Sequence, residues 1–345
     1  MATVAIIGAT GYGGVELIRL LHAHPHVRLS HLSSETYAGQ RVCDVYPHLA
    51  GSEHALQRFD PEAAGKCDFA LLALPAGRSM ETMPRLLDAG ARVVDVSPDF
   101  RLRDPSLYHE WYELEHSCPD LLAEAVIGVP EWNREQVKSA RLVAAPGCYT
   151  TGALLAVAPL VAEDLIDPAD IVVDGKTGIS GAGRTSLHLS FHYPEADEDA
   201  AAYKVTGHRH MPEMVQELQP LTQSEVQVTF TPHLVPMARG ILLTIYVKPR
   251  KGVSAERLRG AFERRYGDEP FVHVLPEGQW PHTKWTVGTN LCFISVGVYR
   301  STGRAIVVAA LDNLGKGMAG QMTQCLNLML GVDESSGLTL SATYP

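Results

Sequence analysis

Short apolar runs alternate with amphipathic stretches along the first part of the chain. The runs predict strands at 3–7, 27–32, 68–74, 93–96, 125–127 and 142–144. Spacing of apolar residues predicts helices from a glycine-rich turn to about residue 23, at 79–89 and at 131–138. Alternation of apolar strands and helices is typical of an α/β domain, so we predict a Rossmann-type, doubly wound parallel sheet.

The pattern changes in the second part of the chain. Strands are predicted at 171–174, 226–232, 241–247, 271–274, 292–299 and 305–311, and between the last five of these a helix is predicted only near 255–265. Strands with so few intervening helices predict an α+β domain with a mixed, largely antiparallel sheet. The residues after 102 and those at 190–203 are expected to be irregular. We predict that 1–147 and about 313–345 form a nucleotide-binding domain, and that 148–312 form a catalytic and oligomerisation domain.

Bulk properties narrow the function. The chain has 345 residues, 46% hydrophobic and 20% charged, with a formal net charge of -10, which argues against nucleic acid and anionic membranes as partners. No apolar run has the length of a membrane span, and a strand is predicted directly at the N-terminus, so no signal peptide is expected. The six cysteines form no CxxC pair. We therefore predict no metal site and no disulfide framework, and a cytoplasmic location.

A glycine-rich turn between the first strand and the first helix predicts a dinucleotide site, because glycines let the backbone approach a pyrophosphate at a helix N-terminus. The cofactor-binding residues predicted here are Gly8, Thr10, Gly11, Tyr12 and Gly13. Pro75, at the carboxyl end of a neighbouring strand, joins them.

The second strand ends in Ser33 and Ser34, where an NAD enzyme usually carries an acid for the ribose. Two hydroxyl groups suit a 2′-phosphate, so NADP(H) is the predicted cofactor. Glu35 argues in the other direction, and Arg41 is either a phosphate partner or a solvated surface residue.

Cys148 follows a strand and the sharp turn Pro146-Gly147, and it begins an Ala/Leu-rich helix. A thiol at a helix N-terminus loses its proton more readily, and the N–H groups there can hold an oxyanion. This arrangement predicts a nucleophile. The alternative is a buried structural cysteine.

His208, His210 and Glu213 gather just before a predicted helix. Histidine carries protons near pH 7, so one of the two imidazoles is the predicted base, with Glu213 orienting it. His210 is preferred, and His208 is the alternative. A metal site there is the less favoured interpretation.

Further candidate groups lie in loops. Backbone near Ser180, Gly181 and Gly183, and the Gly/Lys-rich entrance of the last helix with Asn313 and Lys316, are predicted to contact the cofactor. The candidates for holding the substrate's anionic groups are Arg101, Arg184, Arg209 and, less specifically, Arg239. Arg101 can equally pair with Asp99.

Together these segments resemble the N-acetyl-gamma-glutamyl-phosphate reductases over essentially the whole chain. The resemblance is carried by the motifs at 8–14, 95–102, 146–152, 180–184, 207–213 and 312–317, of which Pro-Gly-Cys-Tyr at 146–149 is the most specific. Thr150 stands where relatives often have proline. The resemblance implies an aspartate-semialdehyde-dehydrogenase-like fold, NADP use, Cys148 as nucleophile, a base near His210 and a homodimer or homotetramer.

The implied activity is the NADPH-dependent reduction of a small-molecule acyl phosphate through a Cys148 thioester, in arginine biosynthesis. Alternatives are the same chemistry on a carrier-linked aminoadipyl phosphate in lysine biosynthesis, a non-covalent NADP dehydrogenase, and a non-catalytic NADP-binding sensor.

Overall fold

The computed structural model describes residues 1–186 and 188–344, and these form two units. Unit 1 contains residues 1–146, 183–185 and 318–339, and the remaining described residues belong to unit 2. Each unit is built around its own seven-stranded sheet.

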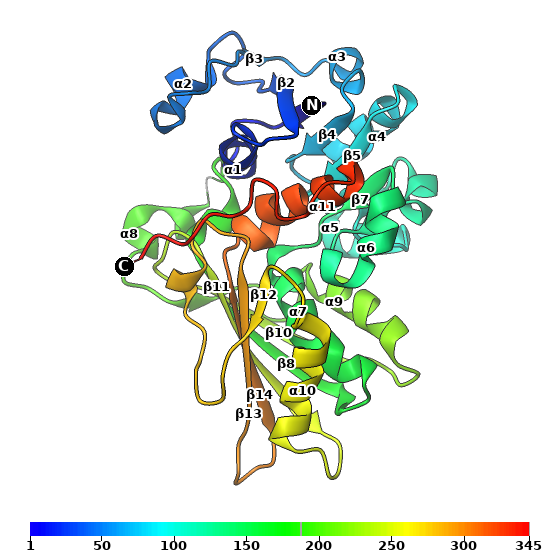
Figure 1. The fold of residues 1–345 in the computed structure, drawn as a ribbon, viewed down its shortest axis with the longest axis vertical. Helices are drawn as coiled ribbons and strands as arrows, with labels where there is room; N and C mark the ends of the chain where they lie inside the picture. The colour runs from blue at the N-terminus through cyan, green and yellow to red at the C-terminus, as the bar shows by residue number, and fades with distance from the viewer. Residues whose placement is uncertain (187, 345) are drawn as a thin grey trace. The chain divides into compact units, whose positions relative to one another are not determined.

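The sheet of unit 1 is parallel throughout (Figure 1). Its order is β3-β2-β1-β4-β5-β7-β6. The strands are β1 (Ala2–Ile7), β2 (Val27–Ser33), β3 (Leu56–Gln57), β4 (Phe69–Leu72), β5 (Arg92–Asp95), β6 (Val126–Ile127) and β7 (Leu142–Ala144). All four residues of β4 are buried, as expected for a strand covered on both faces. The predicted doubly wound sheet is confirmed.

The helices of unit 1 connect these strands and cover the sheet. They are α1 (Tyr12–Leu21), α2 (Val42–Val45), α3 (Pro61–Gly65), α4 (Arg78–Asp88), α5 (Ser106–Tyr112), α6 (Pro130–Ser139) and α11 (Gly320–Leu330). The last of these, α11, packs against α6, α1 and β5, although it comes from the far end of the chain. The Arg92 guanidinium fixes it further by donating to the Met329 carbonyl at 2.6 Å.

Unit 2 has a mixed sheet of order β12-β13-β14-β11-β8-β10-β9. The strands are β8 (Ile166–Thr177), β9 (Ala201–Ala202), β10 (Val228–Leu234), β11 (Ile241–Pro249), β12 (Val272–Val274), β13 (Cys292–Val298) and β14 (Ala305–Leu311). Only the β8–β10 and β12–β13 pairs are parallel among the described pairings, so the predicted mixed, largely antiparallel sheet is confirmed.

Helices pack on this second sheet. They are α7 (Cys148–Ala162), α9 (Met211–Leu218) and α10 (Ala255–Tyr266). Unit 2 also contains the one-turn helix α8 (Tyr193–Ala196). The Ala/Leu-rich α7 contacts β8, β11 and β14 and is flanked by α9 and α10 (Figure 1). Thirteen of its residues, from Tyr149 to Val161, are buried, which explains why it is apolar all round.

Short 3-10 and π-helical turns complete both units. They are η1 (Pro47–Leu49), η2 (Pro98–Phe100), η3 (Pro119–Ala123), η4 (Ile179–Ala182), η5 (Leu189–Phe191), η6 (Gln219–Leu221), η7 (Thr283–Trp285) and the π-helical η8 (Gly315–Ala319).

Two stretches expected to be irregular contain helices, α5 and α8. In α5, the Asp104 carboxylate accepts from the Ser106 N–H at 2.9 Å, while the buried Tyr108 hydroxyl bonds the Leu102 N–H and carbonyl. The second stretch contains one helical turn that begins with Tyr193-Pro194, and proline suits a first turn. Both expectations were wrong because helices of seven and four residues are too short to leave a periodic pattern of apolar residues.

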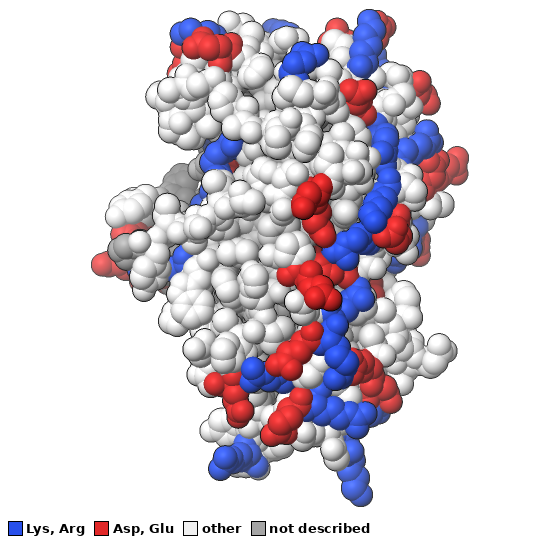
Figure 2. All heavy atoms as spheres, viewed as in Figure 1, with Lys and Arg blue, Asp and Glu red and all other residues white. Residues whose placement is uncertain are grey.

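Charged groups of both signs are mixed on the face that Figure 2 shows, where lysines and arginines alternate with acidic side chains rather than forming a field of one sign. In the part of the chain that the structure describes, every helix is too short or too polar to cross a bilayer.

Candidate active site

Cys148 is the first residue of α7, directly after Gly147, whose extended backbone (ψ 149°) starts the helix. The thiol is half-buried. The N-cap residue Gly147 provides no side-chain hydrogen bond to the first turn. The N–H groups of the first turn therefore point out of the helix beside the sulfur, where they favour a thiolate or an oxyanion.

Glu213 fixes this helix start in unit 2. Its carboxylate is 2% exposed and accepts from the Gly147 N–H at 2.8 Å and from the Thr150 hydroxyl at 2.9 Å. Both donors flank Cys148 in sequence. The structure thus places Glu213 where it holds the cysteine-bearing turn, while its role in orienting an imidazole stays a prediction.

The His210 imidazole lies directly against the residue before the cysteine. A Cβ placed on Gly147 would come within 2.3 Å of His210 Nε2, so only glycine fits there. The buried ring therefore presents Nε2 at the N-terminus of α7. This proximity is what a base for the neighbouring thiol needs.

His208 lies behind His210 rather than at the cysteine. Its Nδ1 accepts from the His210 backbone N–H at 3.2 Å, and its ring is surrounded by the aromatic rings of Tyr149, Tyr203 and Phe230. Burial, reinforced by the neighbouring His210, lowers the pKa of His208 to about 2. His208 is therefore neutral throughout the physiological range and serves as a hydrogen-bond acceptor.

A second side of Cys148 is covered by the loop after β14. A Cβ on Gly317 would come within 2.8 Å of the Cys148 Cβ. Lys316, predicted to face the cofactor, is fully buried with its ammonium 5.9 Å from the centroid of the Phe271 ring. The glycine therefore lies directly against the cysteine.

The other predicted loop residues of unit 2 are bonded to one another. The Asn313 side chain donates to the Ser180 hydroxyl at 2.9 Å and accepts from the Gly240 N–H at 2.8 Å. Arg239 forms an ion pair with the buried Asp312 at 2.9 Å. These bonds hold the loops that contain Ser180, Arg239 and Asn313 in one cluster. A Cβ built on the nearby Gly181 would lie 3.9 Å from Asn313 Nδ2.

The glycine turn of unit 1 has the geometry of a dinucleotide-binding turn. Gly8 has φ 85°, and a Cβ there would lie 2.4 Å from the Ala73 carbonyl oxygen. A Cβ on Gly14 would lie 2.2 Å from the Gly8 carbonyl oxygen. The turn begins α1 at Gly11 without a side-chain cap among the described residues, so its N–H groups suit a pyrophosphate.

The hydroxyl groups at the end of β2 tie this turn in place. Ser33 Oγ accepts from the Gly8 N–H at 3.3 Å, and Ser34 Oγ lies 2.7 Å from Thr10 Oγ1. The Tyr12 side chain is 38% exposed beside the turn, and Pro75 is exposed after β4, the neighbour of β1. These residues of unit 1 fit a nicotinamide dinucleotide.

Arg101 is buried under the carboxyl ends of two strands. Its Nε donates to the Ala145 carbonyl at 2.9 Å and its Nη2 to the Val96 carbonyl. Asp99 instead accepts from the Gly77, Ser79 and Met80 N–H groups at the start of α4. Through these bonds Arg101 holds the carboxyl ends of two strands, and Asp99 holds the start of α4.

The remaining predicted arginines lie in different places. The Arg209 side chain is exposed next to His208, at the entrance of α9. Arg184 and the adjoining Gly183 belong to unit 1, where Nη1 of the arginine donates to the Thr10 carbonyl at 3.1 Å. The structure thus brings Arg184 to the glycine turn.

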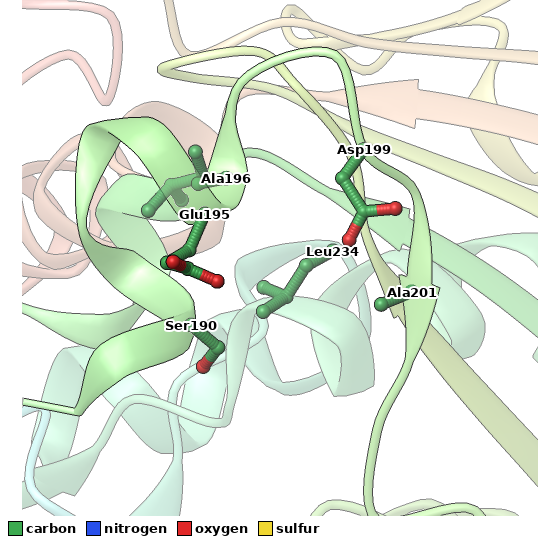
Figure 3. A pocket seen from close by; sticks show the side chains of 7 residues that line it. Ser190, Glu195, Ala196, Asp199, Ala201 and Leu234 are labelled. Carbon is green, nitrogen blue, oxygen red and sulfur yellow. The ribbon is translucent and has the colours of Figure 1, made fainter.

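A separate small pocket of unit 2 lies between α8 and the ends of β9 and β10 (Figure 3). Glu195 and Asp199 line it. Their carboxylates would repel an acyl phosphate, so we do not assign the substrate to it. Across residues 1–186 and 188–344, no three His, Cys, Asp or Glu side chains gather as metal ligands would.

Thr150, Tyr149 and Tyr203 were not among the site residues predicted from the sequence. The Thr150 hydroxyl binds Glu213, and the two tyrosines pack against His208. Burial raises the pKa of Tyr203 to about 12, so its hydroxyl stays protonated. Thr150 could have been predicted, because it directly follows Cys148 and Tyr149 in the sequence. No residue near Tyr203 in the sequence indicated its contact with His208.

Two family models match the chain. The model described as "Semialdehyde dehydrogenase, NAD binding domain" matches residues 3–140, and "Semialdehyde dehydrogenase, dimerisation domain" matches residues 148–313. Proteins named N-acetyl-gamma-glutamyl-phosphate reductase are similar over their full length. The one from Moorella thermoacetica is 45% identical, with 100% of both chains covered, and the one from Magnetococcus marinus is 47% identical, with 99% of this chain and 98% of the relative covered.

Solved structures support the fold alone. Aspartate semialdehyde dehydrogenase II from Vibrio cholerae, complexed with ASA, has a TM-score of 0.73 at 20% identity, with 96% of this chain and 98% of that chain covered. The Candida albicans aspartate semialdehyde dehydrogenase, solved with NADP, has a TM-score of 0.70 at 18% identity, with the same shares covered.

Proposed function

The chain belongs to the semialdehyde dehydrogenase family and, within it, to the N-acetyl-gamma-glutamyl-phosphate reductases, and from this membership we propose that it catalyses their reaction. The substrate is then N-acetyl-gamma-glutamyl phosphate. The products are N-acetylglutamate semialdehyde and inorganic phosphate, in a step of arginine biosynthesis. The observation that carries this proposal is Cys148 at the start of α7 with His210 Nε2 against Gly147.

In the proposed mechanism, Cys148 supplies the nucleophile. Its thiolate attacks the acyl carbon, the carbonyl oxygen becomes an oxyanion beside the N–H groups of α7, and the phosphate leaves with the electrons of the C–O bond. The result is an acyl thioester on Cys148. When bound, the reduced nicotinamide supplies the hydride that takes this thioester to the aldehyde level.

His210 manages the protons in this scheme. Nε2 accepts the proton of the Cys148 thiol before the attack and returns a proton to the substrate oxygen when the thioester is reduced. Collapse of the resulting thiohemiacetal releases the aldehyde and the thiol. His208 keeps the His210 backbone in place, and Glu213 keeps the cysteine-bearing turn in place.

We propose NADPH rather than NADH as the reductant. The end of β2 offers the Ser34 hydroxyl beside that of Thr10, and the Glu35 carboxylate accepts from the Phe59 N–H at 3.0 Å. Glu35, the acid expected to favour NAD, thus binds a backbone N–H group. The hydroxyl groups of Ser34 and Thr10, which suit a phosphate, lie at the end of β2.

We also propose that the protein is a homodimer or homotetramer that pairs through the sheet of unit 2. Alternate residues of β11 and β14 are buried, and those between them, among them Leu242, Tyr246, Ile306 and Val308, are only half-buried. The matching family model is described as a dimerisation domain.

Light scattering after gel filtration is expected to give at least twice the mass of the chain. Val308→Glu is expected to lower this mass. A wild-type protein with the mass of one chain would contradict the pairing.

We propose that the reaction takes place in the cytoplasm. All six cysteines are free thiols, and the proposed nucleophile must remain reduced, which a reducing compartment ensures.

Substrate comparison tests the proposed function. The enzyme is given N-acetyl-gamma-glutamyl phosphate, aspartyl phosphate or a carrier-linked aminoadipyl phosphate, each made by its kinase, and NADPH oxidation is followed. We expect kcat/KM for the first to exceed the others by about 100-fold or more, because a site that hydrogen-bonds one acyl group strongly rejects those lacking its partners. A preference for the carrier-linked substrate would move the protein to the lysine pathway.

A further inference from the structure

Arg184 is at the centre of a polar group at the glycine turn, which we call the Arg184 cluster: Thr10, Ser34, Tyr37, Tyr46 and Arg184. The guanidinium donates to the Thr10 carbonyl at 3.1 Å, to the Tyr46 hydroxyl, and to the Tyr37 hydroxyl at 3.2 Å. It also lies over both tyrosine rings, 4.9 Å from the centroid of Tyr46 and 5.3 Å from that of Tyr37. A segment far along the chain thus delivers a fixed positive charge to unit 1.

The charge of Arg184 has no carboxylate partner among the described residues. Its recorded partners are a backbone carbonyl, two phenolic hydroxyls and two aromatic rings, all of them neutral. Burial dominates in raising the pKa of Tyr46, so that hydroxyl stays protonated. A half-buried cation among neutral groups attracts an anion more strongly than a solvated one does.

Arg41, the arginine that the sequence offered as a phosphate partner, is different. It forms ion pairs with Asp44 at 2.8 Å and with Glu53 at 2.8 Å, and these carboxylates raise the pKa of its guanidinium. Its charge is compensated by the protein itself. Arg41, which the sequence offered as the phosphate partner, is therefore the weaker candidate.

The Arg184 cluster retains donors for a ligand. A guanidinium has five N–H groups, and the three recorded bonds use Nη1 twice and Nη2 once. Nε and one N–H of Nη2 remain. The hydroxyls of Ser34 and Thr10, which lie 2.7 Å apart, belong to the same cluster.

The cluster lies where β2 ends, and in Rossmann-type sheets this is where the ribose 2′-position of the adenosine half is recognised. We propose that Arg184 binds the 2′-phosphate of NADP(H), together with Ser34 and Thr10. Tyr37 and Tyr46 position the guanidinium from both sides. Arg184 then determines cofactor specificity rather than holding the acyl phosphate, and this inference rests on the proposed use of NADPH.

Calorimetric titration of Arg184→Gln tests the assignment, with Arg41→Gln as the matched control. The ligands are NADPH, NADH, 2′,5′-ADP and 5′-AMP, and the last two differ only in the 2′-phosphate. In Arg184→Gln we expect binding of NADPH and 2′,5′-ADP to weaken by about 10- to 100-fold, the loss of charge-assisted hydrogen bonds. Binding of NADH and 5′-AMP should not change, and Arg41→Gln should bind all four as the wild type does.

Two further measurements keep the test decisive if Arg184→Gln folds poorly. Arg184→Lys keeps the positive charge but loses the planar set of N–H donors of the guanidinium. This variant should therefore lose part of its affinity for 2′,5′-ADP and none of its affinity for 5′-AMP. In the wild-type protein, 2′,5′-ADP should protect Arg184 from modification by phenylglyoxal, and 5′-AMP should not.

The possible failures are distinguishable. If wild-type protein binds NADPH no better than NADH, the proposed cofactor preference is wrong. If the wild type prefers NADPH but the Arg184 variants lose affinity for NADPH and NADH equally, the inference is overturned. The guanidinium then binds the pyrophosphate, which both cofactors share, or stabilises the fold. Unchanged affinity for 2′,5′-ADP would overturn it as well.

Discussion

Replacing Cys148 with serine is expected to lower kcat for aldehyde formation by about 10³-fold or more, because a hydroxyl at this position remains protonated and does not form the acyl-enzyme. The helix start itself should persist, since Gly147 and Thr150 bind Glu213 through groups that the substitution does not touch. The measurement is single-turnover oxidation of NADPH with the acyl phosphate.

A matched variant and a labelling experiment accompany it. Cys43 is also half-buried but lies in α2, so Cys43→Ser should retain wild-type kcat. Iodoacetamide should inactivate the wild type by alkylating Cys148, and the acyl phosphate should protect it. Near-normal turnover by Cys148→Ser would eliminate the thioester and favour a non-covalent dehydrogenase.

The second large effect is expected at His210. In His210→Gln the base is lost, so kcat/KM should fall by about 10²- to 10⁴-fold. In the wild type, protonation of the base removes activity as pH falls, which gives an acid limb in the pH profile. Glutamine does not titrate, so that limb should disappear from the profile of the variant, and iodoacetamide should alkylate Cys148 more slowly at neutral pH.

His208→Asn is the control for this experiment. Asparagine can still accept from the His210 N–H, and His208 itself is neutral, with a pKa of about 2, so the acid limb should remain. If the limb disappears only in His208→Asn, the proton carrier is His208.

Burial of His208 also predicts a pH dependence of stability. The unfolded chain takes up a proton on this residue below its ordinary pKa of 6.5, whereas the folded chain does so only near 2. The unfolded state therefore binds more protons in that window, and the free energy of unfolding falls as pH decreases below 6.5, by at most about 1.4 kcal/mol per pH unit. In denaturant titrations His208→Asn should show a shallower decrease over this range.

Much of the fold was predictable because its signals are local. Buried strands such as β4 are continuous apolar runs, and the change from strand–helix alternation to strands alone marks the second sheet. The short helices α5 and α8 were not predictable in this way. Their stability depends on single groups, such as the Tyr108 hydroxyl, whose partner at Leu102 is defined only by the tertiary structure.

In the candidate site, too, some residues could be predicted from local sequence patterns and others could not. Cys148 and the glycine turn occur in strand–turn–helix patterns that can be recognised within a few residues. The choice between His208 and His210 cannot be made that way, since it depends on which ring packs against Gly147 and which is enclosed by aromatic side chains. Arg184 is the extreme case, because its neighbours come from the first part of the chain and no local pattern reveals the contact.

The return of residues 318–339 to unit 1 has a consequence for biosynthesis of the protein. A Cβ on Gly13 would come within 1.6 Å of Met318 Cε, so the returning segment reaches the nucleotide turn itself. Ribosomes extend the chain at about 5–20 residues per second, so this segment emerges well after the strands of the sheet that it covers. We therefore expect nascent chains stopped before Met318 to leave α1 and α6 uncovered, and to require chaperone protection until residues 318–339 have been made.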